Sequence, residues 1–122
     1  MYLIPVSICK FLMNLQEFPW TCQTEADPFG MRDILQEAID NKFRAAGLEA
    51  NIYFQVITRA VFSNNYPVHA SFLRIASRDP ELIIGDVESI EMIGKEMVVR
   101  LTDRYDDKAS FRSVSFLLYD DI

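Results

Sequence analysis

The side chains that could act as a nucleophile, a base or a metal ligand are few. His69 is the only histidine, and no Gly-x-Ser-x-Gly motif accompanies it, so no nucleophile–base pair is indicated. Zinc sites usually draw their ligands from close pairs, whereas Cys9 and Cys22 stand far apart and far from His69. The glycines are scattered and form no phosphate-binding loop. The sequence therefore predicts no enzyme, no metal site and no cofactor.

Carboxylates are concentrated in the last third of the chain. Residues 79–122 hold eleven acidic and five basic residues, a net charge of −6 that equals the charge of the whole chain. Asp86 and Glu88 would share one face of a strand, and two such groups can hold a magnesium ion. A carboxylate-based, metal-dependent hydrolase is therefore one alternative function.

The hypothesis that we favour is an acidic surface that docks on a basic protein, with aromatic side chains as anchors. Complementary charge raises association rate and specificity, and aromatic residues dominate interface hot spots. The residues expected to contact a partner are Asp86, Glu88, Asp103, Tyr105, Asp106, Asp107, Tyr119, Asp120 and Asp121.

Residues 51–78 have the opposite character. They contain no Asp or Glu and carry a net charge of +3. Stacking rings and cations are the ingredients of single-stranded nucleic-acid binding, which is the first alternative function, ahead of the hydrolase. The residues expected to serve it are Tyr53, Arg59, Tyr66, His69 and Arg74. Central strands are depleted of acids, so we expect the segment to form the middle of the sheet. Its arginines could also pair with acids of the strands that follow.

The pattern of apolar residues indicates how these segments are arranged. Residues 28–46 have helical spacing after an Asp27-Pro28 start, and Gly47 is expected to end the helix. Alternation predicts strands at about 52–62, 68–77 and 111–119, and a hairpin of 87–92 with 97–101 that turns at Gly94. We further expect a strand at 3–11, a long loop at 16–29 and a polar loop at 103–109.

The predicted fold is a single α+β domain over 1–122, in which one amphipathic helix packs on a mostly antiparallel sheet of five to six strands. The order is strand, helix, then five strands. Cystatin-like folds have a similar order, but the Gln-Val-Gly hairpin motif of cystatins is absent around Gln55, so the similarity implies shape alone.

The whole chain of 122 residues is half hydrophobic and has no apolar run long enough for a membrane span. Without a basic leader segment, we expect a cytoplasmic protein with free thiols at Cys9 and Cys22. The expected role is that of a small, acidic, non-enzymatic binding protein of the inhibitor, immunity or anti-defence type. We also consider a homodimer, because one helix covers only one face of the sheet and a second copy of the chain could cover the other face.

Overall fold

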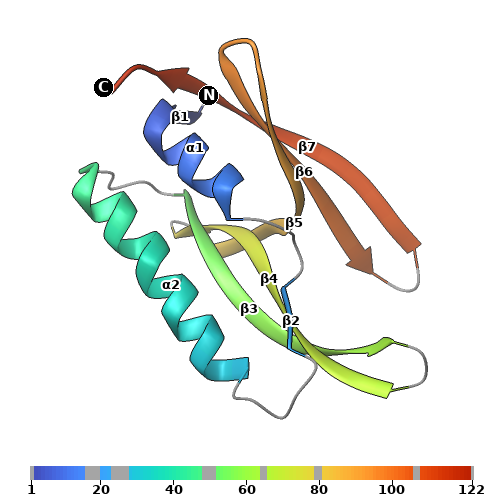
Figure 1. Cartoon of the computed structure of the whole chain (residues 1–122). Helices are drawn as coiled ribbons and strands as arrows, with labels where there is room; N and C mark the ends of the chain where they lie inside the picture. Colours follow the sequence, from blue (N-terminus) through green and yellow to red (C-terminus); the bar gives the residue numbers. More distant parts are fainter. Residues whose placement is uncertain are drawn as a thin grey trace.

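The computed structural model describes residues 2–15, 20–22, 28–47, 52–63, 66–78, 81–105 and 108–121. Side chains are described for 2–15, 30, 32–47, 52–59, 69–78, 81–102 and 112–121. The elements in chain order are β1 (Tyr2–Pro5), α1 (Val6–Asn14), β2 (Trp20–Cys22), α2 (Pro28–Ala45), β3 (Ile52–Ser63), β4 (Tyr66–Arg78), β5 (Glu81–Ile93), β6 (Glu96–Tyr105) and β7 (Lys108–Tyr119) (Figure 1).

All the described strands belong to one sheet of seven strands with the order β1-β7-β6-β5-β4-β2, and β3 pairs with β4 beside this path. Neighbouring strands are antiparallel, apart from the parallel pair β1–β7. The α+β class with a helix on a mostly antiparallel sheet is confirmed. The sheet is wider than predicted because the three-residue strand β2 joins it.

The acid-free segment 51–78 forms the hairpin β3–β4, and its two strands have different positions in the sheet. β4 pairs with β3 along its whole length, with β5 through Arg74–Arg78 and with β2 through His69–Ser71. Among the described strands, β3 pairs with β4 alone. The hairpin is therefore not the middle of the sheet: β4 is interior and β3 lies at an edge.

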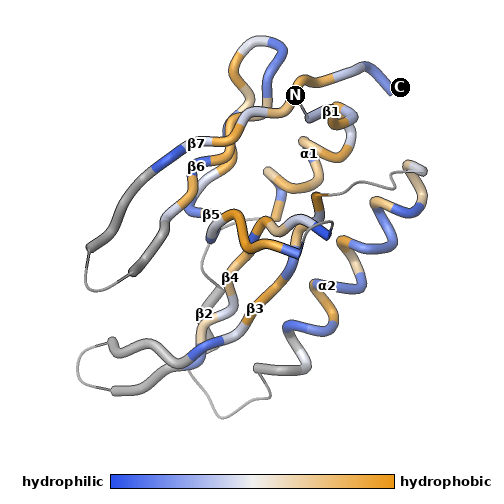
Figure 2. The backbone as a smooth tube through the Cα atoms, turned by 180° about the vertical axis from the view of Figure 1, so that it is seen from behind, coloured by the Kyte–Doolittle hydropathy of each residue, from blue (hydrophilic) through white to orange (hydrophobic). Residues whose placement is uncertain are grey.

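Helix α2 matches its prediction closely. Its apolar stripe packs Ile39, which is buried, together with Leu35 and Phe43 against the core, while Glu37 and Asp40 are exposed. Figure 2 shows the corresponding alternation of hydrophobic and hydrophilic segments along α2. Gly47 has a φ of 70°, the left-handed conformation expected of the residue that ends a helix. The predicted cap Asp27 lies outside the described residues.

The predicted strand at 3–11 is confirmed for residues 3–5 and wrong for residues 6–11, because the chain leaves β1 at Pro5 and forms helix α1. Ile8 and Leu12 are four residues apart and both buried, so the helix places them together in the core, beside Ile4 of β1. Cys9, next to Ile8, is a free and buried thiol, and burial raises the pKa of its thiol. Cys22 has no described side chain.

The C-terminal strands agree with prediction in their order and in the position of the turn, and they differ in length. Gly94 has a φ of 59° and turns the hairpin β5–β6. The predicted polar loop 103–109 is wrong in extent, because β6 runs to Tyr105 and β7 begins at Lys108. The predicted loop 16–29 likewise contains β2 and the start of α2.

The core lies between the helices and one face of the sheet. On β3 the inward residues Ile52, Phe54 and Val56 are buried, as their alternation predicts. Buried Met97 and Phe116 extend the core from β6 and β7 to α1. Within the described residues, neither helix combines the length and the apolar character that crossing a membrane requires.

Candidate functional site

Asp86 on β5 is held by two arginines. Arg59 Nη2 lies 3.0 Å from Asp86 Oδ2, and Arg74 Nε donates to Asp86 Oδ1 at 3.1 Å. Only 14% of the Asp86 side chain is exposed. Asp86 therefore serves an internal ion-pair cluster, in contrast to its predicted place on a partner-binding surface.

The strand register explains why these three side chains meet. Arg74 and Asp86 are direct cross-strand partners in β4–β5. Arg59 lies on β3, where it stacks on the ring of Phe72 with its guanidinium carbon 4.3 Å from the ring centroid. The arginines of the acid-free segment thus pair with an acid of the following strands, which is one of the two interpretations that the sequence allows.

The residues predicted for nucleic-acid binding do not form one surface. Tyr53, Arg59 and Arg74 lie on the sheet face turned away from α2, because they alternate with the core residues of β3 and β4. Arg78 covers Tyr53, with its guanidinium carbon 4.9 Å from the ring centroid. His69 has the parity of the core residue Leu73 and lies on the opposite face. The side chain of Tyr66 lies outside the described residues.

Asp121 also has an internal role. Its Oδ1 accepts the Ser7 backbone N–H at 3.1 Å, and Ser7 Oγ donates to Oδ2, so Asp121 caps the first turn of α1. The hydrogen bond from the Ser7 side chain lowers the pKa of this carboxyl group. Asp121 therefore connects the C-terminal end of the described chain to the start of α1, and its predicted contact with a partner stays a prediction.

Of the remaining residues that were predicted to contact a partner, some have side chains that the structure describes and others do not. Glu88, Tyr119 and Asp120 are exposed. Glu88 is an extra residue where the β5–β6 register shifts between Val87 and Ser89, so the alternation that was expected to align it with Asp86 is interrupted. The side chains of Asp103, Tyr105, Asp106 and Asp107 lie outside the described residues.

An apolar row crosses the outer face of the sheet beside Tyr119. Leu3 pairs with Leu117, Leu117 with Glu96, and Glu96 with Ile93, so the row crosses β1, β7, β6 and β5. The exposed fractions of Leu3 and Ile93 are 60% and 56%. Both helices lie on the other side of β5–β7 (Figure 1). We call Leu3, Ile93, Leu117 and Tyr119 the outer apolar row.

The sequence carried one signal for this row. Leu117 shares its face of β7 with Ser113 and Ser115, both exposed, so an apolar residue there was out of place on a polar face. Leu3 and Ile93 had no such signal, because their position depends on which strands pair.

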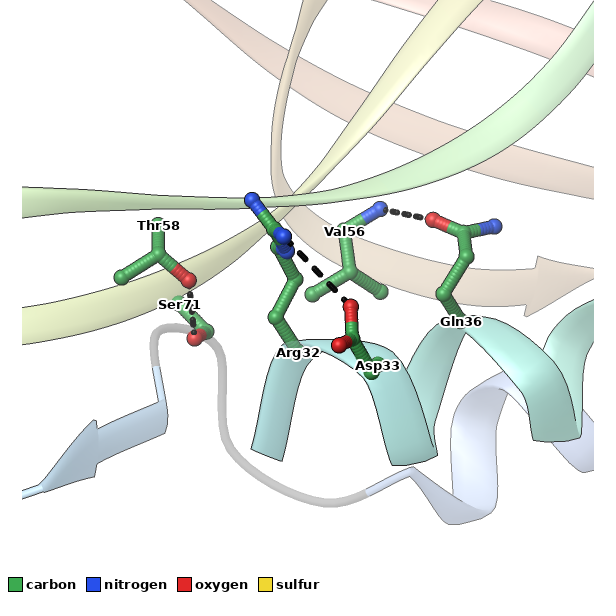
Figure 3. A network of polar contacts seen from close by, with 6 residues as sticks. All are labelled: Arg32, Asp33, Gln36, Val56, Thr58 and Ser71. Carbon is green, nitrogen blue, oxygen red and sulfur yellow. Dashed lines mark hydrogen bonds and ion pairs between the residues drawn. The ribbon is translucent and has the colours of Figure 1, made fainter. Parts of the chain in front are cut away.

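The edge of β3 is closed by α2 near its midpoint. The Gln36 side chain accepts the Val56 N–H at 2.7 Å (Figure 3). It also donates to the Phe54 carbonyl at 3.1 Å. It thereby takes the place of one residue of a neighbouring parallel strand. Thr58 and buried Ser71 share a hydrogen bond of 2.9 Å between their hydroxyl groups on the β3–β4 ladder.

No three His, Cys, Asp or Glu side chains among the described residues are grouped closely enough to hold a metal ion. Comparisons of the chain with protein-family models, with curated proteins and with solved structures find no match. The function must therefore be argued from these surfaces.

Proposed function

We propose that this chain is a non-enzymatic binding protein that docks a protein partner on the outer face of β1, β7, β6 and β5. The observation that carries the proposal is the outer apolar row, which exposes four large side chains on β1, β7 and β5, with Glu96 of β6 between Leu117 and Ile93. Exposed apolar side chains are common singly, but a group rimmed by polar residues is typical of an interaction site. Tyr119, at the end of the row, supplies the aromatic anchor.

The charge around the row favours a partner with a basic surface. Glu91 and Glu96 are exposed on the same strands, and Asp120 follows Tyr119, against Lys95 in the hairpin turn and Arg100 four residues along β6 from Glu96. A partner that covers the outer apolar row would lie directly over Glu96 and would bring its rim against Glu91 and Asp120. A second copy of this chain would bring acid against acid, and the chain carries a net charge of −6. We therefore favour a different, basic protein over a homodimer.

The test compares two pairs of exposed apolar residues. The chain is used to capture and identify a binding protein from cells that produce it, and the affinity is then measured with both purified proteins. Ile93→Ser with Leu117→Ser should weaken binding by at least about tenfold, because buried apolar anchors dominate interface energy. The matched control, Ile34→Ser with Leu82→Ser, changes side chains that are also exposed but lie elsewhere and should bind as the wild type does.

Two measurements complete the test. Glu91→Gln with Glu96→Gln should slow association and reduce its dependence on salt, because exposed charges act mainly on encounter. The mass of the wild-type chain in solution should be that of a monomer. The proposal is overturned if the two apolar pairs weaken binding equally, or if the wild type is a dimer that Ile93→Ser with Leu117→Ser dissociates.

A further inference from the structure

A hollow lined by arginines lies at the β3 edge, away from the outer apolar row. Its volume is about 480 Å³, and its lining comes from α2, from residues on both faces of β3, and from Arg74 of β4, so the hollow extends around the β3 edge. The lining includes three arginines, which are Arg32, Arg59 and Arg74, and one acid, Asp33. A cationic hollow in a chain with a net charge of −6 runs against the charge of the molecule as a whole.

Two of these arginines are fixed in place before any ligand arrives. Asp86 bonds to one nitrogen of Arg59 and one nitrogen of Arg74, and the Phe72 ring supports the Arg59 guanidinium from below. A guanidinium has five N–H donors in a rigid plane, so each of these groups has further donors beyond its bond to Asp86. An anion that bound them would immobilise little additional side chain, which reduces the entropic cost of binding.

One carboxylate also leaves the pair of arginines with a net positive charge. Asp86 neutralises one of two guanidinium charges, and both arginines are partly buried, with exposed fractions of 36% for Arg59 and 22% for Arg74. Screening by solvent is weaker there than on an open surface. The cluster of Asp86, Arg59 and Arg74 therefore has a net charge of +1 at the wall of the hollow.

The opposite wall is held at a fixed distance by Gln36. Its two bonds to Val56 and Phe54 tie α2 to β3, and its Nε2 also donates to Asp40 Oδ1 at 3.1 Å. Arg32 rises from α2 to the level of β3, with Asp33 Oδ1 3.4 Å from its Nη2 (Figure 3). The hollow thus has a third cation on a rigidly attached helix.

We propose that this hollow binds a small oxyanion ligand, with its carboxylate or phosphate group held by Arg59 and Arg74 on the sheet side and by Arg32 on the helix side. Planar guanidinium groups match the geometry of both oxyanions. The volume lies within the range of roughly 300–1,000 Å³ that is usual for small-molecule sites. The site is separate from the outer apolar row, so either proposal can fail without the other.

Calorimetric titration tests the proposal with two probes, inorganic phosphate and succinate, at an ionic strength held constant with sodium chloride. We expect one of the two to bind at millimolar concentration or below, and the tighter probe identifies the chemical source. Arg59→Gln and Arg32→Gln should each weaken that binding by roughly 10- to 100-fold, because each removes charge-assisted hydrogen bonds.

Arg44→Gln is the matched control, since Arg44 is an exposed arginine in the last turn of the same helix and should leave the affinity unchanged. Arg32→Gln leaves the Asp86 cluster intact, so it tests the site even if Arg59→Gln fails to fold. Absence of heat with both probes up to tens of millimolar overturns the proposal, as does equal weakening by Arg44→Gln and Arg32→Gln.

Discussion

Replacing Asp86 by Asn removes the charge that Arg59 and Arg74 share and preserves the size of the side chain. The Arg74 contact joins side chains that are 22% and 14% exposed, where a hydrogen bond between charged groups contributes about 1.5–3 kcal/mol. The Arg59 contact involves a side chain that is 36% exposed, so screening limits it to about 1 kcal/mol or less. Since an amide retains part of this bonding, the expected loss of unfolding free energy is about 2–3 kcal/mol.

Urea and thermal unfolding followed by circular dichroism measure this loss. For a domain of this size, 1 kcal/mol corresponds to about 3–5 °C, so Asp86→Asn should lower the midpoint by roughly 6–15 °C. The matched control is Glu88→Gln, which neutralises an exposed carboxylate on the same strand and should change stability by less than about 0.5 kcal/mol. A double-mutant cycle with Arg74→Gln should give a coupling of at least about 1 kcal/mol.

The reasoning would be refuted by equal effects of Asp86→Asn and Glu88→Gln. It would also be refuted by a coupling near zero between Asp86 and Arg74, because the two side chains would then contribute independently. Raising the salt concentration should reduce the effect of Asp86→Asn only in part, since the Arg74 contact is mostly shielded from solvent.

Two further predictions follow from the closure of the sheet edge and from the helix cap. Gln36→Ala removes the partner of two backbone groups of β3 and should lower the unfolding free energy by about 1–2 kcal/mol. It should also speed hydrogen exchange at the Val56 amide, whereas the control Glu37→Ala, at an exposed position, should leave that exchange rate unchanged. The bond with Ser7 holds the pKa of Asp121 below its ordinary value of 3.8, so Asp121 stabilises the fold above that pH, and protonation removes the contribution as pH falls through the lowered pKa. The difference in melting temperature between the wild type and Asp121→Ala should therefore be constant near neutral pH and shrink below pH 3.8; a difference that grows on acidification would contradict the assignment.

The elements that were predicted well carry a single unambiguous period or a special backbone position. The stripe of α2 fits only a helix, and Gly94 marks the β5–β6 turn by its positive φ. The segment that became α1 fits two periods at once. Val6 and Ile8 would share one face of a strand, and Ile8 and Leu12 share one face of a helix. Only contact with the core on β5 and β7 decides between them, and that contact is not local in the sequence.

The candidate sites depended even more on pairing between distant residues. In the sequence, Asp86 is one of eleven acidic residues in 79–122, and nothing local distinguishes it. Its internal role depends on its pairing with Arg74 in the β4–β5 register. A bulge beside Glu88 and another between Ile75 and Ala76 shift that register by single residues. Alternation within one strand cannot predict such shifts, so the sequence could name the charged residues without assigning their partners.

The parallel pairing of β1 with β7 has a consequence for how the chain folds and opens. Tyr2 stands beside Phe116, and the Ser7–Asp121 contact spans 114 positions of sequence. Bringing such distant segments together carries a large loop-closure entropy, so these contacts are expected to form after the antiparallel ladder of β3–β7. The β1–β7 pairing and the Ser7–Asp121 contact would also be the first to open in the native state, and their opening would release β1, and with it Leu3, from the sheet. A partner bound to the outer apolar row would contact Leu3 and would therefore stabilise the pairing of β1 with β7.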